Sequence, residues 1–86
     1  MYYFYVLKIR QNGKLYKGYT NNLKRRLAEH RRGDSTFTSK NGIFDLVFYE
    51  AYSDERDARK AERYFKSGHG REILKDKITH SIGGVA

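Results

Sequence analysis

The dipeptide Asn12-Gly13 constrains the fold more than any other feature of the sequence, because it separates two alternating, tyrosine-rich runs. Asn-Gly between such runs is a strong signal of a two-residue hairpin turn, since both residues accept a positive φ at little cost. A two-residue turn places Tyr5 opposite Thr20. The chain is therefore predicted to open with an antiparallel β-hairpin.

Alternation of side chains gives this hairpin two faces. One face carries Tyr5, Leu7, Ile9, Tyr16, Gly18 and Thr20, and the other carries Phe4, Val6, Lys8, Leu15, Lys17 and Tyr19. Glycine inside a strand marks either a bulge or a place where a ligand or another backbone comes close, and both interpretations of Gly18 are open. In this register Tyr5 and Tyr16 are about 13 Å apart along the strands. Either a bulge closes that gap or the two tyrosines have separate roles.

The composition indicates one small intracellular domain. Eighty-six residues suffice for a single core, so residues 1–82 are expected to form one domain and residues 83–86 a frayed tail. The sequence holds no cysteine, which excludes disulfides and thiolate zinc sites. No apolar run reaches transmembrane length and no signal segment opens the chain, so a cytoplasmic location without a membrane is expected.

The net charge of +8 is confined to the first half of the chain. Residues 1–40 hold ten Lys or Arg against two acids, whereas residues 41–86 hold eight of each. A one-sided basic field interleaved with aromatic residues is typical of nucleic-acid binders, although solubility or an acidic membrane surface are alternative explanations. The candidate phosphate contacts are Lys8, Arg10, Lys14, Lys17, Lys24, Arg25, Arg31, Arg32 and Lys40.

A helix is predicted from a cap within residues 20–22 to the stop at Gly33. Leu23 and Leu27 define its apolar stripe, and at about 100° per residue Arg26 and His30 fall at the edge of that stripe. Arg26 and His30 have two interpretations. They are either snorkelling, hydrogen-bonded side chains or a phosphate clamp beside a proton carrier.

The rest of the chain is predicted as a loop, a strand and two helices. The polar loop of residues 34–42 carries one large apolar side chain, Phe37, and is expected to border the site. The strand of residues 44–52 is apolar on both faces, which favours the middle of the sheet or cover by helices. A helix capped by Ser53 or Asp54 should run to about Ser67, Gly68-His69-Gly70 should break the chain, and a last helix should follow over residues 71–82.

Glu62 is anomalous because it falls within the apolar stripe of the second predicted helix, beside Ala58, Ala61 and Phe65. A carboxylate on a buried face destabilises the fold unless it is paired or binds a metal. Glu62 is therefore either a structural salt bridge or a metal ligand. A lone carboxylate suits Mg²⁺, which keeps most of its waters and takes substrate phosphate.

The unusual residues occur in an order that resembles the GIY-YIG nuclease superfamily. Tyr3-Phe4-Tyr5 matches its first motif at the tyrosine only, and Tyr16-Lys17-Gly18 matches its Tyr-x-Gly motif. Arg26 with His30 matches the Arg and His pair, and Glu62 matches the helical Glu. Two features of the pattern are absent: the glycine and isoleucine of the first motif, and the C-terminal Asn that some relatives carry. The resemblance covers nearly the whole chain and is closest to short, stand-alone bacterial members.

The resemblance implies an α+β fold, a small three-stranded antiparallel sheet flanked by helices in the order β-β-α-β-α-α. It also implies an endonuclease that hydrolyses phosphodiester bonds in nucleic acid, DNA rather than RNA, with one Mg²⁺ or Mn²⁺ ion. The implied catalytic residues are Tyr5, Tyr16, Arg26, His30 and Glu62, with Glu62 as the metal ligand. A protein partner is a possible source of specificity.

Chemistry from the residues agrees with this division of roles. Arg26 suits the non-bridging phosphate oxygens because of its fork of donors, and a metal supplies further charge stabilisation. Either Tyr5 or His30 activates water, and Tyr16 orients the water or the phosphate. The alternatives are a non-catalytic DNA- or RNA-binding module and an interaction domain that docks an acidic protein.

Overall fold

A computed structural model shows the predicted α+β fold, and it describes residues 1–33 and 42–83. The predicted loop with Phe37, the candidate contact Lys40 and most of the predicted frayed tail lie outside these residues. The elements follow the predicted order β-β-α-β-α-α: β1 (Tyr2–Ile9), β2 (Leu15–Thr20), α1 (Leu23–Arg31), β3 (Phe44–Tyr52), α3 (Glu55–Lys66) and α4 (Gly68–Lys77). None of the described helices has the length and apolar character needed to cross a membrane.

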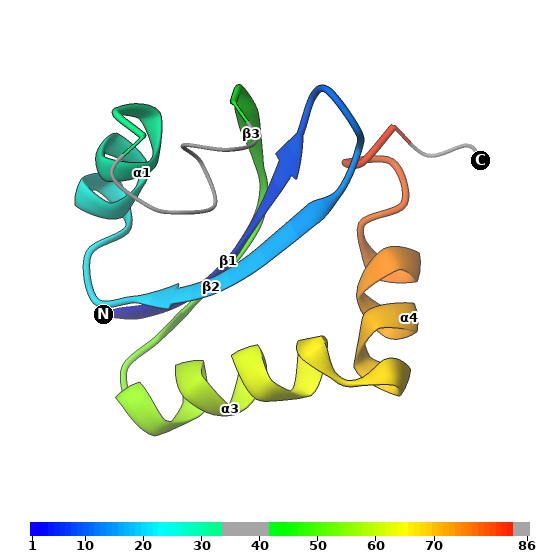
Figure 1. Cartoon of the computed structure of the whole chain (residues 1–86). Helices are drawn as coiled ribbons and strands as arrows, with labels where there is room; N and C mark the ends of the chain where they lie inside the picture. The colour runs from blue at the N-terminus through cyan, green and yellow to red at the C-terminus, as the bar shows by residue number, and fades with distance from the viewer. Residues whose placement is uncertain (34–41, 84–86) are drawn as a thin grey trace.

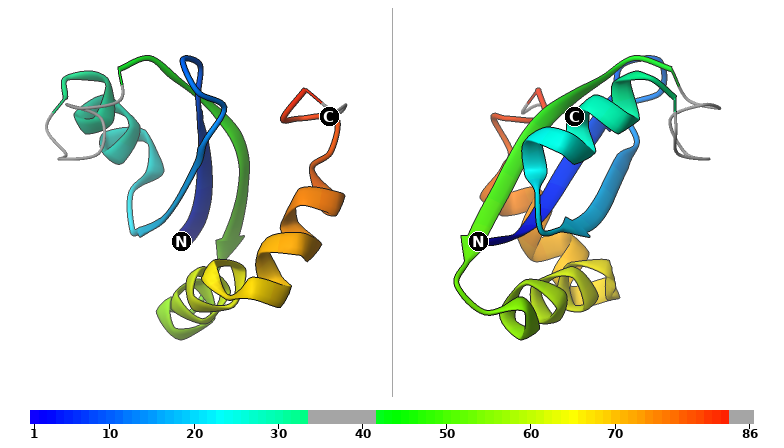
Figure 2. Two further views of the ribbon diagram at one scale, coloured as in Figure 1. Left: turned by 45° about the vertical axis from the view of Figure 1, so that its right-hand side comes forward. Right: turned by 90° about the vertical axis from the view of Figure 1, so that its left-hand side faces the viewer.

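The three strands form one antiparallel sheet in the order β2-β1-β3. Helix α1 lies on one side of this sheet, whereas α3 and α4 lie on the other (Figures 1 and 2). The central strand β1 is buried on both faces from Phe4 to Leu7 because helices cover both sides. The sheet therefore has an α1 face and an α3/α4 face, and its two edge strands are β2 and β3.

The hairpin forms at the predicted place, but its loop has four residues instead of the predicted two, and the strands are shorter as a result. Ile9 and Lys14 close the loop through an Ile9 N to Lys14 O bond of 2.9 Å. Gly13 has the positive φ that the turn requires, +71°, whereas Asn12 does not and instead accepts the Lys14 N–H with its side chain. The predicted pairing of Tyr5 with Thr20 is therefore wrong: Tyr5 lies opposite Gly18.

The two faces predicted for the hairpin are confirmed, because a shift of two residues returns every side chain to the same face. The α3/α4 face packs Phe4 and Val6 against Phe65 and Leu74, and the Phe4 and Phe65 rings stack with centroids 5.0 Å apart. The α1 face is a smaller cluster centred on Tyr5, Leu7 and Leu27. Most of the core thus lies on the α3/α4 face, and the α1 face holds the more polar cluster.

Strand β3 has the predicted bounds, and of the two alternatives for its apolar faces the structure shows cover by helices rather than a place in the middle of the sheet. It is an edge strand, and helices on both sides explain its two apolar faces. A bulge opposite Val6 and Leu7 interrupts its alternation. As a result Leu46 packs on the α1 face, whereas both Val47 and Phe48 pack on the α3/α4 face.

The segment Gly68-His69-Gly70 is the first turn of α4, so the predicted break there is wrong. Ser67 caps this helix by accepting the Gly70 N–H at 3.1 Å. Gly70 is buried, and a Cβ on it would overlap the carbonyl oxygen of Tyr64. The glycine thus permits α4 to begin directly after α3, and α4 ends at Lys77 rather than at residue 82.

Candidate active site at the edge of the sheet

The close approach at Gly18 involves the ring of Tyr5. A Cβ built on Gly18 would lie 2.5 Å from the Tyr5 hydroxyl oxygen and 2.6 Å from its Cζ, closer than real Cβ contacts come. The β1–β2 pairing runs without a shift in register, so the bulge, one of the two interpretations of Gly18, is absent from this hairpin. Gly18 therefore leaves room for a side chain of its own domain, rather than for a ligand or another backbone.

Tyr5 and His30 form a buried hydrogen-bonded pair. The Tyr5 hydroxyl oxygen lies 2.9 Å from His30 Nε2, and both residues are 1% exposed. Their rings meet edge to face with centroids 5.8 Å apart. His30 reaches Tyr5 because it lies in the last turn of α1, on the edge of the helix stripe that the sequence indicated.

Burial sets the protonation of this pair. It raises the pKa of Tyr5 to about 12, and the nearby Arg26 guanidinium offsets only part of that rise. Burial also lowers the pKa of His30 below its ordinary value, and the charge of Arg26 lowers it further. At neutral pH the pair is consequently a neutral phenol beside a neutral imidazole, which can exchange a proton along one short hydrogen bond.

Arg26 supplies the positive charge of the cluster. Burial disfavours that charge, but the Tyr5 phenol and the Glu29 carboxylate outweigh burial and hold the pKa of Arg26 above its ordinary value. Glu29 Oε1 lies 3.1 Å from Arg26 Nη1, and the Arg26 side chain keeps 30% of its surface exposed. Arg26 is therefore a fixed guanidinium that solvent, and thus a phosphate, can still reach.

Tyr16 completes the cluster on β2. Its ring centroid lies 6.2 Å from that of Tyr5 and 5.4 Å from that of His30. The two tyrosines are closer than predicted, because Tyr5 lies opposite Gly18 and Tyr16 is two residues from Gly18 on β2 rather than four residues from the predicted partner of Tyr5. Tyr16 is half-buried whereas Tyr5 is enclosed, so Tyr16 is the phenol that a molecule at this edge can touch first.

The structure thus brings four of the five predicted catalytic residues into one cluster, and it places Glu62 on another element. Glu62 lies on α3, whose buried residues pack against the opposite face of the sheet. Its carboxylate pairs with Lys66 one turn along at 3.1 Å, with 24% of the Glu62 side chain exposed. The salt bridge predicted as one alternative for Glu62 is therefore present, and its partner is Lys66, one helical turn away.

The flank of α3 that carries Glu62 borders β2. Near the start of α3, Glu55 accepts a hydrogen bond from Tyr19 and Arg59 lies over the Tyr19 ring. Near its end, Lys66 is among the cations that lower the pKa of Lys17. Glu62 lies between these two points on the helix. The edge strand β2 therefore has the tyrosine cluster on its α1 face and the Glu62 flank of α3 on its other face.

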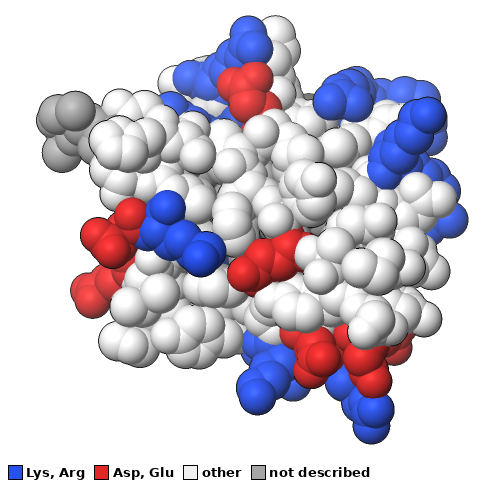
Figure 3. All heavy atoms as spheres, turned by 180° about the vertical axis from the view of Figure 1, so that it is seen from behind, with Lys and Arg blue, Asp and Glu red and all other residues white. Residues whose placement is uncertain are grey.

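The predicted phosphate contacts lie in three settings. Three are exposed on α1 and Arg32 is exposed at its C-cap; Figure 3 shows cations at the upper right, on the side where α1 lies, and cations mixed with acids along the lower edge. Lys14 is exposed in the hairpin loop. Lys8 and Arg10 are engaged elsewhere, since Lys8 donates to the Ile82 carbonyl at 2.9 Å and Arg10 pairs with Asp45 at 2.8 Å. The α1 set comprises Lys24, Arg25, Arg31 and Arg32.

Sequence reasoning missed a second group of cations around Lys17. Burial, then the charges of Arg71, Lys75 and Lys66, lowers the pKa of Lys17. The sequence had assigned no net charge to the second half of the chain, and the fold places three of its cations beside one from the first half. The spacing of Arg71 and Lys75, one helical turn, was the signal that could have found them.

Comparisons with known proteins agree with this arrangement. The sequence model of a family described as the GIY-YIG catalytic domain matches residues 1–75. A UPF0213 protein of Bacillus licheniformis is 44% identical over 66 residues, 76% of this chain and 67% of that protein. A UPF0213 protein of Pediococcus acidilactici is 40% identical over 77 residues, covering 86% and 78% of the two chains. The solution NMR structure of a UPF0213 protein from Bacillus halodurans is similar, with 31% identity, a TM-score of 0.55, and coverage of 88% of this chain and 84% of that one.

The motif order, the fold and these matches converge. The chain belongs to the GIY-YIG family, among its short bacterial UPF0213 proteins.

Proposed function

We propose that this protein is a divalent-metal-dependent endonuclease that hydrolyses phosphodiester bonds in nucleic acid, with DNA as its substrate. The observation that supports this most is the contact of Tyr5, His30, Tyr16 and Arg26 at one edge of the sheet. A core needs no guanidinium beside two phenols and an imidazole. Phosphodiester hydrolysis needs a cation for the phosphate and a base for water, and this cluster holds both.

Arg26 binds the non-bridging oxygens of the scissile phosphate. Its guanidinium offers paired donors that fit a phosphate, and Glu29 holds its orientation from one turn along the helix. Removing a single donor of this kind from a site that stabilises developing negative charge lowers the rate by about 10²–10³. Tyr16, the more accessible phenol, orients the attacking water or the phosphate.

Tyr5 and His30 act together as the base. Because the Tyr5 hydroxyl is enclosed at rest, a water has to reach it past the half-buried Tyr16 ring. The Tyr5 oxygen then takes a proton from that water while its own proton passes to His30 Nε2 along the 2.9 Å hydrogen bond. This direction requires the imidazole tautomer with its proton on Nδ1. The raised pKa of Tyr5 and the lowered pKa of His30 keep the proton on Tyr5 at rest, so the transfer accompanies attack on phosphorus. The new oxygen–phosphorus bond replaces the bond to the leaving oxygen, which takes a proton from solvent.

Glu62 is the residue that would hold the metal. No group of three potential metal ligands occurs in the described part of the chain, and Glu62 is the one carboxylate among the five predicted catalytic residues. That suits Mg²⁺, which binds through one or two carboxylates, its own waters and substrate phosphates. The ion pair of Glu62 with Lys66 is an exposed contact worth about 1 kcal/mol or less, so it opposes metal binding only weakly. The bound ion would stabilise charge on the phosphate.

The Glu62–Lys66 pair also favours a second candidate function, a non-catalytic nucleic-acid-binding module with the same fold. Such a module keeps Arg26 and the basic face of α1 but has no use for a metal ligand. The two functions differ in one observable, which is strand cleavage that depends on a divalent ion.

The test is a cleavage assay on labelled single-stranded, duplex and branched DNA, and on RNA of matched sequence, with Mg²⁺, Mn²⁺ or a chelator. Glu62→Gln should abolish cleavage and leave binding equal or slightly tighter, because it removes a negative charge near phosphate. Glu72→Gln, on the exposed side of α4, is the matched control. Arg26→Ala should lose cleavage and part of the affinity together, since the guanidinium meets phosphate before and during the reaction. Arg63→Ala, exposed on α3, is its control.

Binding without metal-dependent cleavage of any of these substrates would favour the binding module. If Glu62→Gln and Arg26→Ala both melt far below wild type while activity per folded molecule is unchanged, the two residues have structural roles and the proposed mechanism fails.

A further inference from the structure

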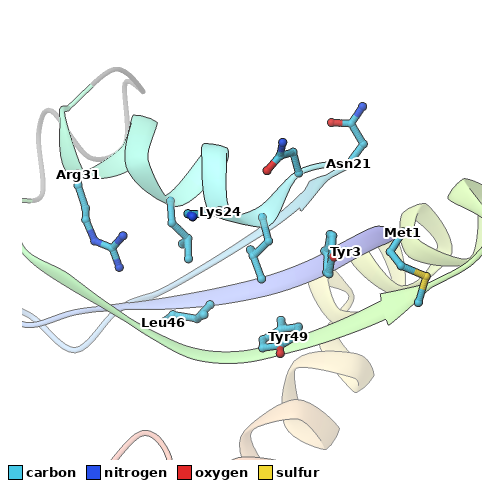
Figure 4. Close-up of a pocket in the computed structure, with 10 residues that line it drawn as sticks. Met1, Tyr3, Asn21, Lys24, Arg31, Leu46 and Tyr49 are labelled. Atoms are coloured by element: carbon cyan, nitrogen blue, oxygen red, sulfur yellow. The ribbon is translucent and has the colours of Figure 1, made fainter.

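A groove between α1 and β3 lies beside the candidate active site and has no role in the proposed mechanism. Its volume is about 640 Å³, and it lies on the α1 face of the sheet. Figure 4 shows Tyr3 and Tyr49 on adjacent strands at its floor and Arg31 reaching from α1 toward the sheet. We propose that this groove binds an unpaired stretch of the nucleic acid, with bases on Tyr3 and Tyr49 and phosphates on Lys24 and Arg31. The inference rests on the proposed function for its class of ligand.

The floor of the groove is an exposed aromatic platform. The rings of Tyr3 and Tyr49 meet edge to face with centroids 6.1 Å apart, and Tyr49 is 53% exposed. Neither hydroxyl has a hydrogen-bond partner within residues 1–33 and 42–83. Aromatic rings stack on bases of any sequence, and a base must be unpaired to offer its face. The platform therefore fits a single strand and not an intact duplex.

The rim of the groove is positively charged and its lining contains no acid. Lys24 and Arg31 lie on the same flank of α1, and neither forms an ion pair with a carboxylate of the described residues. This is unusual in a chain with ten Asp and Glu, and on the same helix Arg25 and Arg26 are both close to Glu29. The nearby Glu50 instead accepts a bond from Tyr52 and lines a different pocket. Arg31 does lie over the Phe44 ring, 5.9 Å from its centroid, but its charge has no acidic partner among the described residues. An anionic strand thus meets cations without acidic partners at the rim and aromatic rings below.

The groove and the tyrosine cluster are close enough for one strand to occupy both. Tyr49 on β3 is the register partner of Tyr5, and Tyr5 is in turn the partner of Gly18 on β2. Neighbouring strands are about 4.8 Å apart, so the platform begins one strand away from the proposed base. On α1, Arg26 and His30 occupy one flank and Lys24 and Arg31 the other, separated by the stripe of Leu23 and Leu27. A nucleic-acid strand that crosses α1 would thus place its scissile phosphate at Arg26 and a flanking base on Tyr49 at the same time.

The test is fluorescence anisotropy with a labelled oligothymidine and a duplex of equal length, in chelator so that no cleavage occurs. Tyr49→Ala should weaken single-strand binding by about 5- to 150-fold, the loss expected for one stacked base, and change duplex binding by less than about twofold. Tyr64→Ala is the matched control, because Tyr64 is also exposed, at 42%, but lies on α3. Replacing Lys24 and Arg31 together by Gln should reduce the slope of log affinity against log salt by about 1.4 on the single strand.

An unchanged single-strand affinity of Tyr49→Ala would overturn the inference, as would an equal loss on both oligonucleotides. A wild-type dimer that Tyr49→Ala dissociates, with oligonucleotide binding unaltered, would assign the groove to a second copy of the chain and also overturn it. If wild type cleaves or binds nucleic acid and Tyr49→Ala shows none of the expected loss, only this inference fails. If wild type binds no nucleic acid, the proposed function fails with it.

Discussion

Replacing Gly18 by alanine tests the central contact of the site, the Tyr5 ring against the backbone of β2. The added methyl would lie 2.5 Å from the Tyr5 hydroxyl oxygen, and ordinary contacts begin at 3.4 Å. The phenol must therefore move by about 1 Å, although it is buried and bonded to His30. Overpacking of this kind costs about 1–3 kcal/mol. The backbone at Gly18 has no positive φ, so alanine itself adds no strain there.

Alanine also has a stabilising effect that offsets part of this cost. It reduces the freedom of the unfolded chain, which is worth about 0.5–1 kcal/mol at a position without strain. The middle of the two ranges gives an expected net loss for Gly18→Ala of about 1.3 kcal/mol. In a domain of this size that lowers the melting temperature by roughly 5–10 °C. The effect on cleavage should be larger, because a displacement of about 1 Å in a catalytic constellation costs up to about 100-fold.

Thermal unfolding followed by circular dichroism measures the first effect, and the cleavage assay measures the second. Gly68→Ala is the matched control, because a Cβ at Gly68 meets nothing within 4 Å and the residue lies in the first turn of α4. That variant should be as stable as wild type or more stable by up to about 1 kcal/mol. If Gly18→Ala is as stable and as active as the control, Tyr5 is not held against β2 and the reasoning is refuted.

Three further predictions concern other parts of the molecule. Gly70→Ala should destabilise the domain by about 3 kcal/mol or more, since its Cβ would overlap the Tyr64 carbonyl oxygen; a melting temperature equal to that of Gly68→Ala would contradict this. The lowered pKa of His30 means that the unfolded chain binds its proton more readily, so stability is full above about pH 6.5 and falls by up to about 1.4 kcal/mol per unit below it. Melting curves across that range should show the loss, and His30→Gln should flatten it whereas His69→Gln should not. Duplex binding should weaken with salt with a slope of about −3.6, because each of the four exposed cations of the α1 set releases counterions worth about −0.9; a salt-independent affinity in an anisotropy titration would mean that they do not contact phosphate.

The sequence predicted the elements better than their contacts because the relevant signals are local. Asn22 and Asp54 cap α1 and α3, and Gly33 ends the first helical segment with a φ of +75°, as their residue types indicate. The Ser67 cap was missed, because Gly68 and Gly70 resemble a break when they are considered without Tyr64. The buried glycine is explained only by the backbone of a neighbouring helix, which no local pattern contains.

The sequence indicated which residues belong to the candidate site, but it did not indicate how those residues lie relative to one another. Arg26 and His30 were noted at the edge of a helical stripe, and that edge does face Tyr5. The place of β3 at the sheet edge depended on which strand the others pair with, a long-range choice that its apolar pattern leaves open. The relation of Glu62 to the cluster is of the same kind, because it depends on how α3 lies along β2.

The register of the hairpin shows why such choices require the whole fold. Slipping β1 against β2 by two residues keeps every side chain on its face, so hydrophobic alternation cannot distinguish the observed register from the predicted one. Packing distinguishes them, because the Tyr5 ring lies across β2 and needs a residue without a side chain there. Gly18 is the one glycine of β2. Only the register that pairs Tyr5 with Gly18 therefore lets the Tyr5 ring pack flat against β2 and reach His30. In the predicted register Tyr5 would face Thr20. The Thr20 side chain would then occupy the space of the Tyr5 ring, and the Tyr5 hydroxyl would lose its hydrogen bond to His30. The glycine that weakens the strand thereby fixes its register, and with it the position of the tyrosine in the cluster.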